Sequence, residues 1–189
     1  MKKFIFLVLL LTVVVSGTFA LDKNIGFGPG MNFAKTKGNF QNADWTMNRV
    51  GMGGFIFFGI SRFIELNLGF LGKFPDAMEV NGQSMSTYGV DSTFALQAGI
   101  YGKIPITLGS RFVFFPTAGA DFEFTLGEND WWHELWLRAG LGADIFLSRK
   151  FFIRAHALGG FAFPFGGEEG LGLKSSAGFM GKLGFGWML

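Results

Sequence analysis

One segment of this chain has a histidine close in sequence to two carboxylates, a combination that metal sites and acid–base catalysis use. His133 follows two tryptophans and lies near Asp130 and Glu134. An imidazole beside two carboxylates is a potential metal ligand or general base. A histidine next to a tryptophan pair is also typical of an aromatic zone at the edge of a membrane. The composition of this segment favours that second interpretation over a metal or catalytic site.

The second histidine, His156, has Arg154 and Leu158 as its neighbours two residues away on either side. A hydrolase that acts through histidine needs a serine or a similar nucleophile beside the imidazole, and neither neighbour supplies one. The glycine-rich stretches near residues 26–30 and 51–54 precede no predicted helix, so they do not indicate a nucleotide site. We therefore expect no catalytic residue, no metal site and no cofactor, and we expect that the chain is not an enzyme.

Along several segments, ionisable residues occupy one set of alternate positions and large apolar residues occupy the other. Successive side chains of a β-strand point to opposite faces, so this alternation predicts strands with one charged face and one apolar face. The residues predicted to share the charged face are Arg49, Glu65, Asp91, Lys103, Arg111, Asp121, Glu123, Glu134, Arg138, Asp144, Arg154, His156 and Lys182. We expect them to form an internal network, with His156 as a member.

Eight segments follow this alternation. They are residues 25–34, 47–60, 63–74, 88–104, 111–126, 134–147, 151–165 and about 175–189. Within these ranges no Asp, Glu, Lys or Arg falls on the apolar face. From Phe179 to Leu189, every second residue of the last segment is apolar or glycine: Phe179, Gly181, Leu183, Phe185, Trp187 and Leu189. So strict an exclusion of charge indicates that the apolar face meets lipid.

The connections between these segments alternate in length. Residues 61–62 and 148–150 are short links and 105–110 is somewhat longer, whereas 35–46, 75–87, 127–133 and 166–174 are longer and polar. Short turns at one end and longer loops at the other are typical of a transmembrane barrel, and an even number of strands lets the sheet close without a free edge. The predicted fold is all-β, an eight-stranded antiparallel up-and-down transmembrane β-barrel.

The first twenty residues have a different character from the rest. Lys2 and Lys3 precede an apolar run, and small residues follow it up to Ala20. This pattern predicts a cleaved secretory signal peptide, residues 1–20, and a single barrel domain, residues 21–189. Loss of Lys2 and Lys3 leaves 14 basic residues against 14 acidic ones. A neutral chain without a basic cluster does not indicate nucleic-acid binding.

The signal peptide, the eight alternating segments, the loop asymmetry and the terminal strand together resemble the small eight-stranded outer-membrane β-barrels of the OmpX, OmpW and OmpA-barrel type. The resemblance covers residues 21–189. It implies a location in the cell outer membrane, contact with outer-membrane lipids, and recognition of the C-terminal strand by the barrel-assembly machinery. The last residue departs from the family pattern, because Leu189 stands where an aromatic residue is usual.

Three functions are compatible with this sequence. An eight-stranded barrel has an interior that side chains can fill, so the favoured function is a monomeric barrel with a plugged, charge-networked lumen and a structural or surface-interaction role. Its long, mainly acidic loops would offer a surface for an extracellular ligand. The alternative is a narrow pore or conduit for small, even hydrophobic, solutes. A lipid-modifying enzyme is the third, and a soluble ligand-binding barrel is the rival at the level of the fold.

Overall fold

The computed structural model describes residues 23–40, 42–87, 92–126, 131–165 and 172–189. The strands in these ranges are β1 (Asn24–Phe40), β2 (Ala43–Gly59), β3 (Ile64–Val80), β4 (Gln83–Met85), β5 (Thr93–Lys103), β6 (Ile106–Leu108), β7 (Phe112–Leu126), β8 (Trp131–Phe146), β9 (Phe151–Phe165) and β10 (Leu173–Met188). The search for a helix that is long and apolar enough to span a membrane finds none in these residues. The predicted signal peptide lies outside the described residues.

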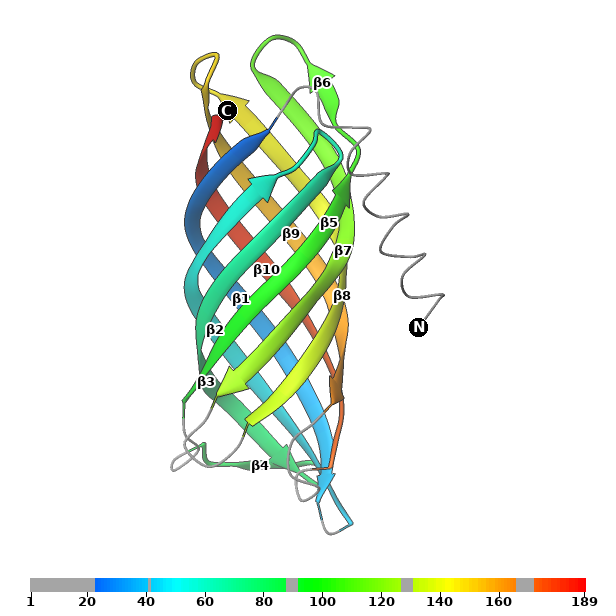
Figure 1. Cartoon of the computed structure of the whole chain (residues 1–189). Coiled ribbons are helices and arrows are strands. Elements are labelled where there is room, and N and C mark those ends of the chain that lie inside the picture. The colour runs from blue at the N-terminus through cyan, green and yellow to red at the C-terminus, as the bar shows by residue number, and fades with distance from the viewer. Residues whose placement is uncertain (1–22, 41, 88–91, 127–130, 166–171) are drawn as a thin grey trace, which may run out of the picture.

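Eight long strands of the described chain close into a barrel (Figure 1). Their order is β2-β1-β10-β9-β8-β7-β5-β3, and pairing of β2 with β3 closes the ring. Every pair in the ring is antiparallel, including the first long strand with the last, β1 with β10. The two short strands are additions at the ends, β4 on β3 and β6 on β7. The predicted eight-stranded antiparallel barrel is confirmed.

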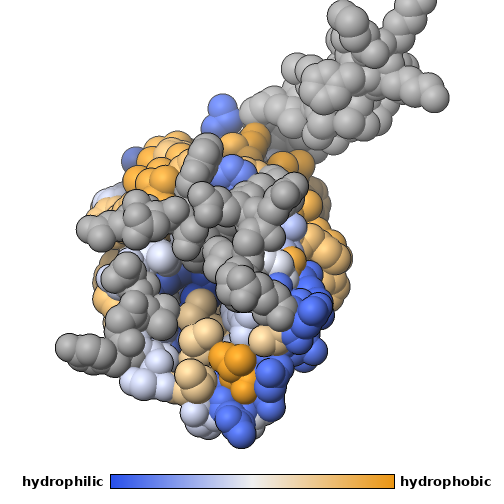
Figure 2. All heavy atoms as spheres, turned by 90° about the horizontal axis from the view of Figure 1, so that it is seen from below, coloured by the Kyte–Doolittle hydropathy of each residue, from blue (hydrophilic) through white to orange (hydrophobic). Residues whose placement is uncertain are grey.

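The two ends of the barrel differ. One end, at the top of Figure 1, holds the C-terminus, β6 and the turns after β2 and β8; we call it the turn end. The other, which we call the loop end, holds β4 and the last residues of β1, β7 and β9. Figure 2 views the molecule from the loop end and shows hydrophilic atoms in the opening, with hydrophobic atoms along much of the outer wall.

A belt of exposed apolar side chains covers the outer wall between the two ends. Each long strand contributes alternate residues to it, and examples are Phe27, Met52, Leu68, Leu96, Phe122, Leu137, Phe161 and Leu183. All exposed charged residues in the described part of the chain lie towards one end or the other. Apolar exposure on this scale far exceeds the patches found on soluble monomers. The belt is the lipid-facing surface that the alternating pattern predicts.

The strands are longer than the sequence pattern indicates. β1 continues to Phe40, and β3 continues to Val80, through segments predicted as loops. A 17-residue strand is roughly 55 Å long at ~3.3 Å per residue, so even when tilted it extends beyond an apolar belt of ~25 Å. In this extension of β1, Lys35 and Lys37 occupy the outer face. Charge is therefore excluded from the belt but not from the whole outer face.

Local backbone chemistry explains how β3 turns back into β4. Asn81 and Gly82 both have positive φ, 49° and 79°, and they join Val80 to Gln83 directly. An Asn-Gly pair with φ > 0 at both positions is typical of a two-residue hairpin turn, because glycine adopts that backbone without steric cost. The predicted loop at 75–87 therefore contains a hairpin.

Pro116 lies within β7 without interrupting it. Its pairing with Leu141 of β8 continues in register on both sides, so there is no bulge here. On the other side, the pairing of β5 with β7 ends at Thr117, and the Pro116 carbonyl accepts a hydrogen bond from Ile104. The missing N–H of proline thus falls where β5 leaves the sheet, and little ladder hydrogen bonding is lost.

Candidate functional site in the barrel lumen

The lumen holds most of the polar residues that the sequence assigned to the charged face. Those with an exposed fraction of 7% or less are Arg49, Glu65, Lys103, Asp121, Glu123, Glu134, Arg138, Asp144, Arg154, His156 and Lys182. They come from β2, β3, β5, β7, β8, β9 and β10. Because strand side chains alternate between the two faces, the same pleat that exposes the apolar belt directs these groups inward.

Four ionic residues pair in the half of the lumen nearer the loops; we call Arg49, Lys73, Glu123 and Glu134 the loop-side cluster. Lys73 bridges the two acids, with a salt bridge to Glu123 and one of 3.4 Å to Glu134. Arg49 lies 3.3 Å from the other oxygen of Glu134. Neutral side chains complete the shell: Ser176 Oγ donates to Glu134 at 2.6 Å, and Gln97 Nε2 donates to Glu123 at 2.7 Å.

Four others, Glu65, Lys103, Asp144 and Arg154, form the turn-side cluster. Arg154 donates to both oxygens of Asp144, each at 2.6 Å, in a bidentate pair. It also contacts Glu65, which accepts a second bond of 3.0 Å from Lys103. The remaining oxygen of Glu65 accepts from Asn67 at 2.9 Å. Two acids and two bases balance in each cluster, as burial of charge requires.

The middle of the lumen has a different balance. Arg138 Nε donates to Asp121 at 2.9 Å, and Asp121 also accepts from Tyr101. Within the described residues, Nη1 and Nη2 of Arg138 have no hydrogen-bond partner. Lys182 donates to Asn67 at 3.3 Å, and the salt bridges found in the described chain do not include it. Leu71, Leu158 and Met180 pack with Tyr101 at this level. The middle therefore carries an excess of positive charge.

The two histidines lie on opposite sides of the barrel wall. His133 is on the outer-face parity of β8 and stacks on Phe124, with ring centroids 4.6 Å apart. Glu134 faces the lumen, so the two side chains cannot share a metal ion or a proton. His156 is buried in the lumen with its ring edge-on to Phe115 at 5.2 Å. Its Nε2 has no partner among the described residues, so this histidine fills space rather than joining the ionic pairs.

Three residues require correction or addition. Arg111, predicted to face the lumen, is exposed, because β7 begins one residue later at Phe112. Phe63 is at a charged-face position of the segment 63–74, yet it is 41% exposed in the turn after β2. Lys73 was missed, although it precedes Phe74 on the charged face of its strand. Asp91 lies outside the described residues.

Small polar residues are the other group that the sequence pattern did not single out. Thr36 accepts from Arg49 at 2.6 Å, and its hydroxyl lies 3.0 Å from that of Ser176. No apolar alternation marks these positions in the sequence, because Thr36 lies between Lys35 and Lys37 and Ser176 follows Ser175. The described loop end carries three exposed acids, Asp44, Asp76 and Glu79, and three exposed bases, Lys35, Lys37 and Lys174. The described residues of the loop end therefore do not have the excess of acidic side chains that the sequence predicted for the long loops.

Asp44 connects three segments at the loop end. It accepts hydrogen bonds from Asn39 at 2.9 Å and from Lys174 at 3.0 Å, and its backbone N–H donates to Asn81 at 3.1 Å. The hydrogen bond from Asn39, followed by that from Lys174 and the charge of Lys174, holds the pKa of the Asp44 carboxyl below its ordinary value.

We expect Asn39→Ala to raise the pKa of Asp44 towards its ordinary value. The carboxylate loses a donor that favours the charged form. Because the folded pKa is lowered, these contacts stabilise the barrel above a pH of about 4 and are lost as the pH falls through the folded pKa. NMR titration of the Asp44 carboxyl carbon measures the change. Asn48→Ala, an exposed change elsewhere on β2, is the control, and an equal shift in both variants would contradict the assignment.

Comparisons with known proteins agree with this architecture. No protein-family model and no curated protein sequence matches the chain. Among solved structures, the outer membrane protein OprG from Pseudomonas aeruginosa is similar, with a TM-score of 0.56 and 13% identity over 90% of this chain and 96% of that chain. The outer membrane protease OmpT from Escherichia coli has a TM-score of 0.40 and 8% identity over 89% of this chain and 96% of that chain.

The likeness to OprG bears on the fold. A closed antiparallel barrel, an outer belt of apolar side chains and a polar lumen are the properties that lipid requires of a membrane-spanning sheet. The chain has all three, on strands that match an outer-membrane barrel over most of their length. The protein has the fold of a small outer-membrane β-barrel.

Proposed function

We propose that this barrel is closed to solutes and acts in a structural or surface-interaction role in the outer membrane. The observation that supports this most is the pairing of buried charges from one end of the lumen to the other. The loop-side cluster, the Asp121–Arg138 pair and the turn-side cluster, which we together call the plug, follow one another along the bore. Solutes would have to break several buried ion pairs, and each break is costly.

Planar-bilayer recording tests this proposal. The refolded full-length barrel should give no stable, reproducible conductance steps, because the plug holds the lumen shut. A large porin refolded in the same lipid is the positive control for insertion, and heat-modifiable gel mobility shows that the barrel has folded. Reproducible channels with a single conductance level would contradict the closed barrel.

A narrow anion conduit is the second candidate, and one observation favours it. The middle of the lumen holds Arg138 with two nitrogens that lack partners in the described chain, and Lys182 bonded there to a neutral amide. A surplus of positive charge at a constriction favours anions. If channels are recorded, the reversal potential in a salt gradient should show anion selectivity, and Lys182→Gln should reduce it.

We propose no catalytic activity for the chain. His156 packs against Phe115 rather than beside a hydroxyl, and His133 and Glu134 face opposite sides of the wall. Neither arrangement supplies a nucleophile with an adjacent base. Lipid-hydrolysis assays with the refolded barrel in vesicles test this, and product release above that of a His156→Ala variant would contradict it.

Two further proposals concern partners. The terminal strand β10 presents Phe179, Leu183, Phe185 and Trp187 outward, which supports recognition by the barrel-assembly machinery. Cross-linking from Phe185 during assembly would detect that contact. The closed ring leaves no free edge for pairing with another copy, which supports a monomer.

The loops at 127–130 and 166–171, where an extracellular ligand would dock, lie outside the described residues.

A further inference from the structure

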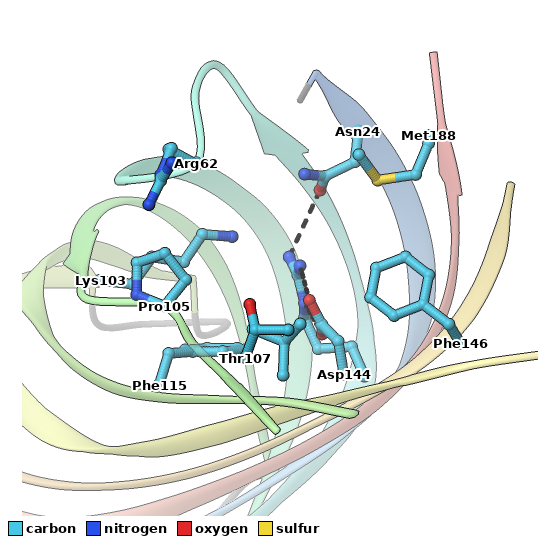
Figure 3. Close-up of a pocket in the computed structure, with 11 residues that line it drawn as sticks. Asn24, Arg62, Lys103, Pro105, Thr107, Phe115, Asp144, Phe146 and Met188 are labelled. Atoms are coloured by element: carbon cyan, nitrogen blue, oxygen red, sulfur yellow. Dashed lines mark hydrogen bonds and ion pairs between the residues drawn. The ribbon is translucent and has the colours of Figure 1, made fainter. Parts of the chain in front are cut away.

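A cavity of about 220 Å³ opens at the turn end of the barrel. Its charged and polar lining includes Arg62, Lys103 and Thr107, and its apolar lining includes Phe115, Phe146 and Met188. Figure 3 shows Arg62, from the turn after β2, and Lys103, from the end of β5, extending toward the same space, with Phe115 below Lys103 and Phe146 on the far side. The turn-side cluster closes the cavity towards the middle of the lumen, since Asp144 and Arg154 also line it.

The cations of this cavity have donors to spare. Arg62 stacks on Phe63, with its guanidinium carbon 4.8 Å from the ring centroid, and makes no hydrogen bond within the described chain. Lys103 donates to one carboxylate oxygen, that of Glu65 at 3.0 Å. An ammonium has three donors and a guanidinium has five. A ligand with acceptor oxygens can therefore bind without displacing an existing contact.

The carboxylates of the cavity are already occupied. Both oxygens of Asp144 accept from Arg154. Glu65, behind the cavity, accepts from Lys103, Arg154 and Asn67. Neither acid is left to bind a cation, and their charges are offset by Lys103 and Arg154. Arg62 then gives the cavity a net positive charge.

The surrounding rim has the same sign. The exposed charged side chains at the turn end, within the described chain, are Lys23, Arg62, Arg111, Arg149 and Lys150, and no exposed Asp or Glu accompanies them there. The loop end, by contrast, carries both signs. Charge of one sign around a concave site raises the local concentration of oppositely charged ligands.

We propose that this cavity binds a small organic anion, a carboxylate attached to a compact apolar body. The carboxylate would be held by Arg62 and Lys103, and the apolar body would pack against Phe115, Phe146 and Met188. A pocket with an apolar wall and a few convergent donors is the usual form of a small-molecule site. The ligand enters from the turn end, which is the periplasmic side in barrels of this kind. Binding here does not require an open lumen, so the site would add a function to a barrel that is closed to solutes.

Benzoate binding to the full barrel in phospholipid vesicles tests the proposal. Titration calorimetry should detect saturable binding of benzoate, much weaker binding of benzyl alcohol, which has a similar ring without the charge, and weaker binding of inorganic phosphate, which lacks the apolar body. Arg62→Gln should weaken benzoate binding about tenfold, as expected for loss of a charge-assisted contact.

Arg149→Gln is the matched control, since Arg149 is an exposed rim cation that does not line the cavity. At about 0.15 M salt it should change benzoate affinity less than about twofold, because charges beyond ~8 Å are screened. Equal weakening by both substitutions, equal or tighter binding of phosphate, or no saturable benzoate binding would each overturn the proposal. If Arg62→Gln does not fold, Thr107→Val provides a second test, with weakened benzoate binding expected and unchanged binding counting against the site.

Discussion

Glu65→Ala should lower the free energy of unfolding by about 3–5 kcal/mol, the cost of removing one partner from a buried ion pair. Glu65 is 1% exposed and accepts hydrogen bonds from Lys103, Arg154 and Asn67. Its removal leaves Lys103 with no carboxylate partner and Arg154 with Asp144 alone. Two buried cations then face one anion in the turn-side cluster.

Urea unfolding of the barrel in lipid vesicles, followed by tryptophan fluorescence, measures this effect. Glu79→Ala is a matched control, because Glu79 lies on the same strand but is exposed at the loop end, and it should change stability by less than about 0.5 kcal/mol. The double variant Glu65→Ala/Lys103→Met should recover part of the loss, since it removes the unpaired ammonium as well. Equal stability of the Glu65 and Glu79 variants would show that water, not Lys103 and Arg154, compensates Glu65.

Leu68→Arg should destabilise the folded barrel by about 2–4 kcal/mol, the cost of a basic side chain on the lipid face at mid-membrane. Leu68 is 51% exposed and lies opposite Ile56 and Ala98, in the middle of the apolar belt. A guanidinium there has no water and no carboxylate within reach, so it must deform the bilayer or leave it.

Leu108→Arg provides the control, because Leu108 is 56% exposed, slightly more than Leu68, but lies in β6 at the turn end. Substitution there should cost about 0–1 kcal/mol, as at the interfaces of other barrels. The two substitutions are chemically identical and differ only in depth. A soluble barrel would tolerate both within about 0.5 kcal/mol, so equal small effects in vesicles would argue against the lipid-facing belt.

Alternation along the sequence determined the strands and their faces. Glu65, Asp121 and Arg154 are inward, and Phe27, Leu68 and Phe161 are outward, as parity predicts, because the pleat of a strand is a local property of its backbone. The same rule would have placed Lys73 in the lumen. It failed at Arg111 because parity has meaning only inside a strand, and β7 begins at Phe112.

Strand ends were less predictable. β1 and β3 continue through polar residues that carry no apolar alternation, since these parts extend beyond the belt and neither face needs lipid. In β3, the left-handed backbone at Asn81 and Gly82 decides where the chain reverses.

Only the closed barrel decided which buried charges meet. Glu65 and Arg154 are 89 positions apart, and Lys73 and Glu134 are 61 apart, yet each pair is in contact across the lumen. Such pairs depend on the stagger of strands around the ring, which local alternation does not encode. The sequence by itself determined a lipid-facing barrel with charges inside. The tertiary structure decided that these charges form two balanced clusters with a positive middle, because such contacts cross the lumen and exist only once β1 pairs with β10 and closes the ring. It also decided that Arg62 joins Lys103 over a cavity at the turn end, because β3 pairs with β5 there.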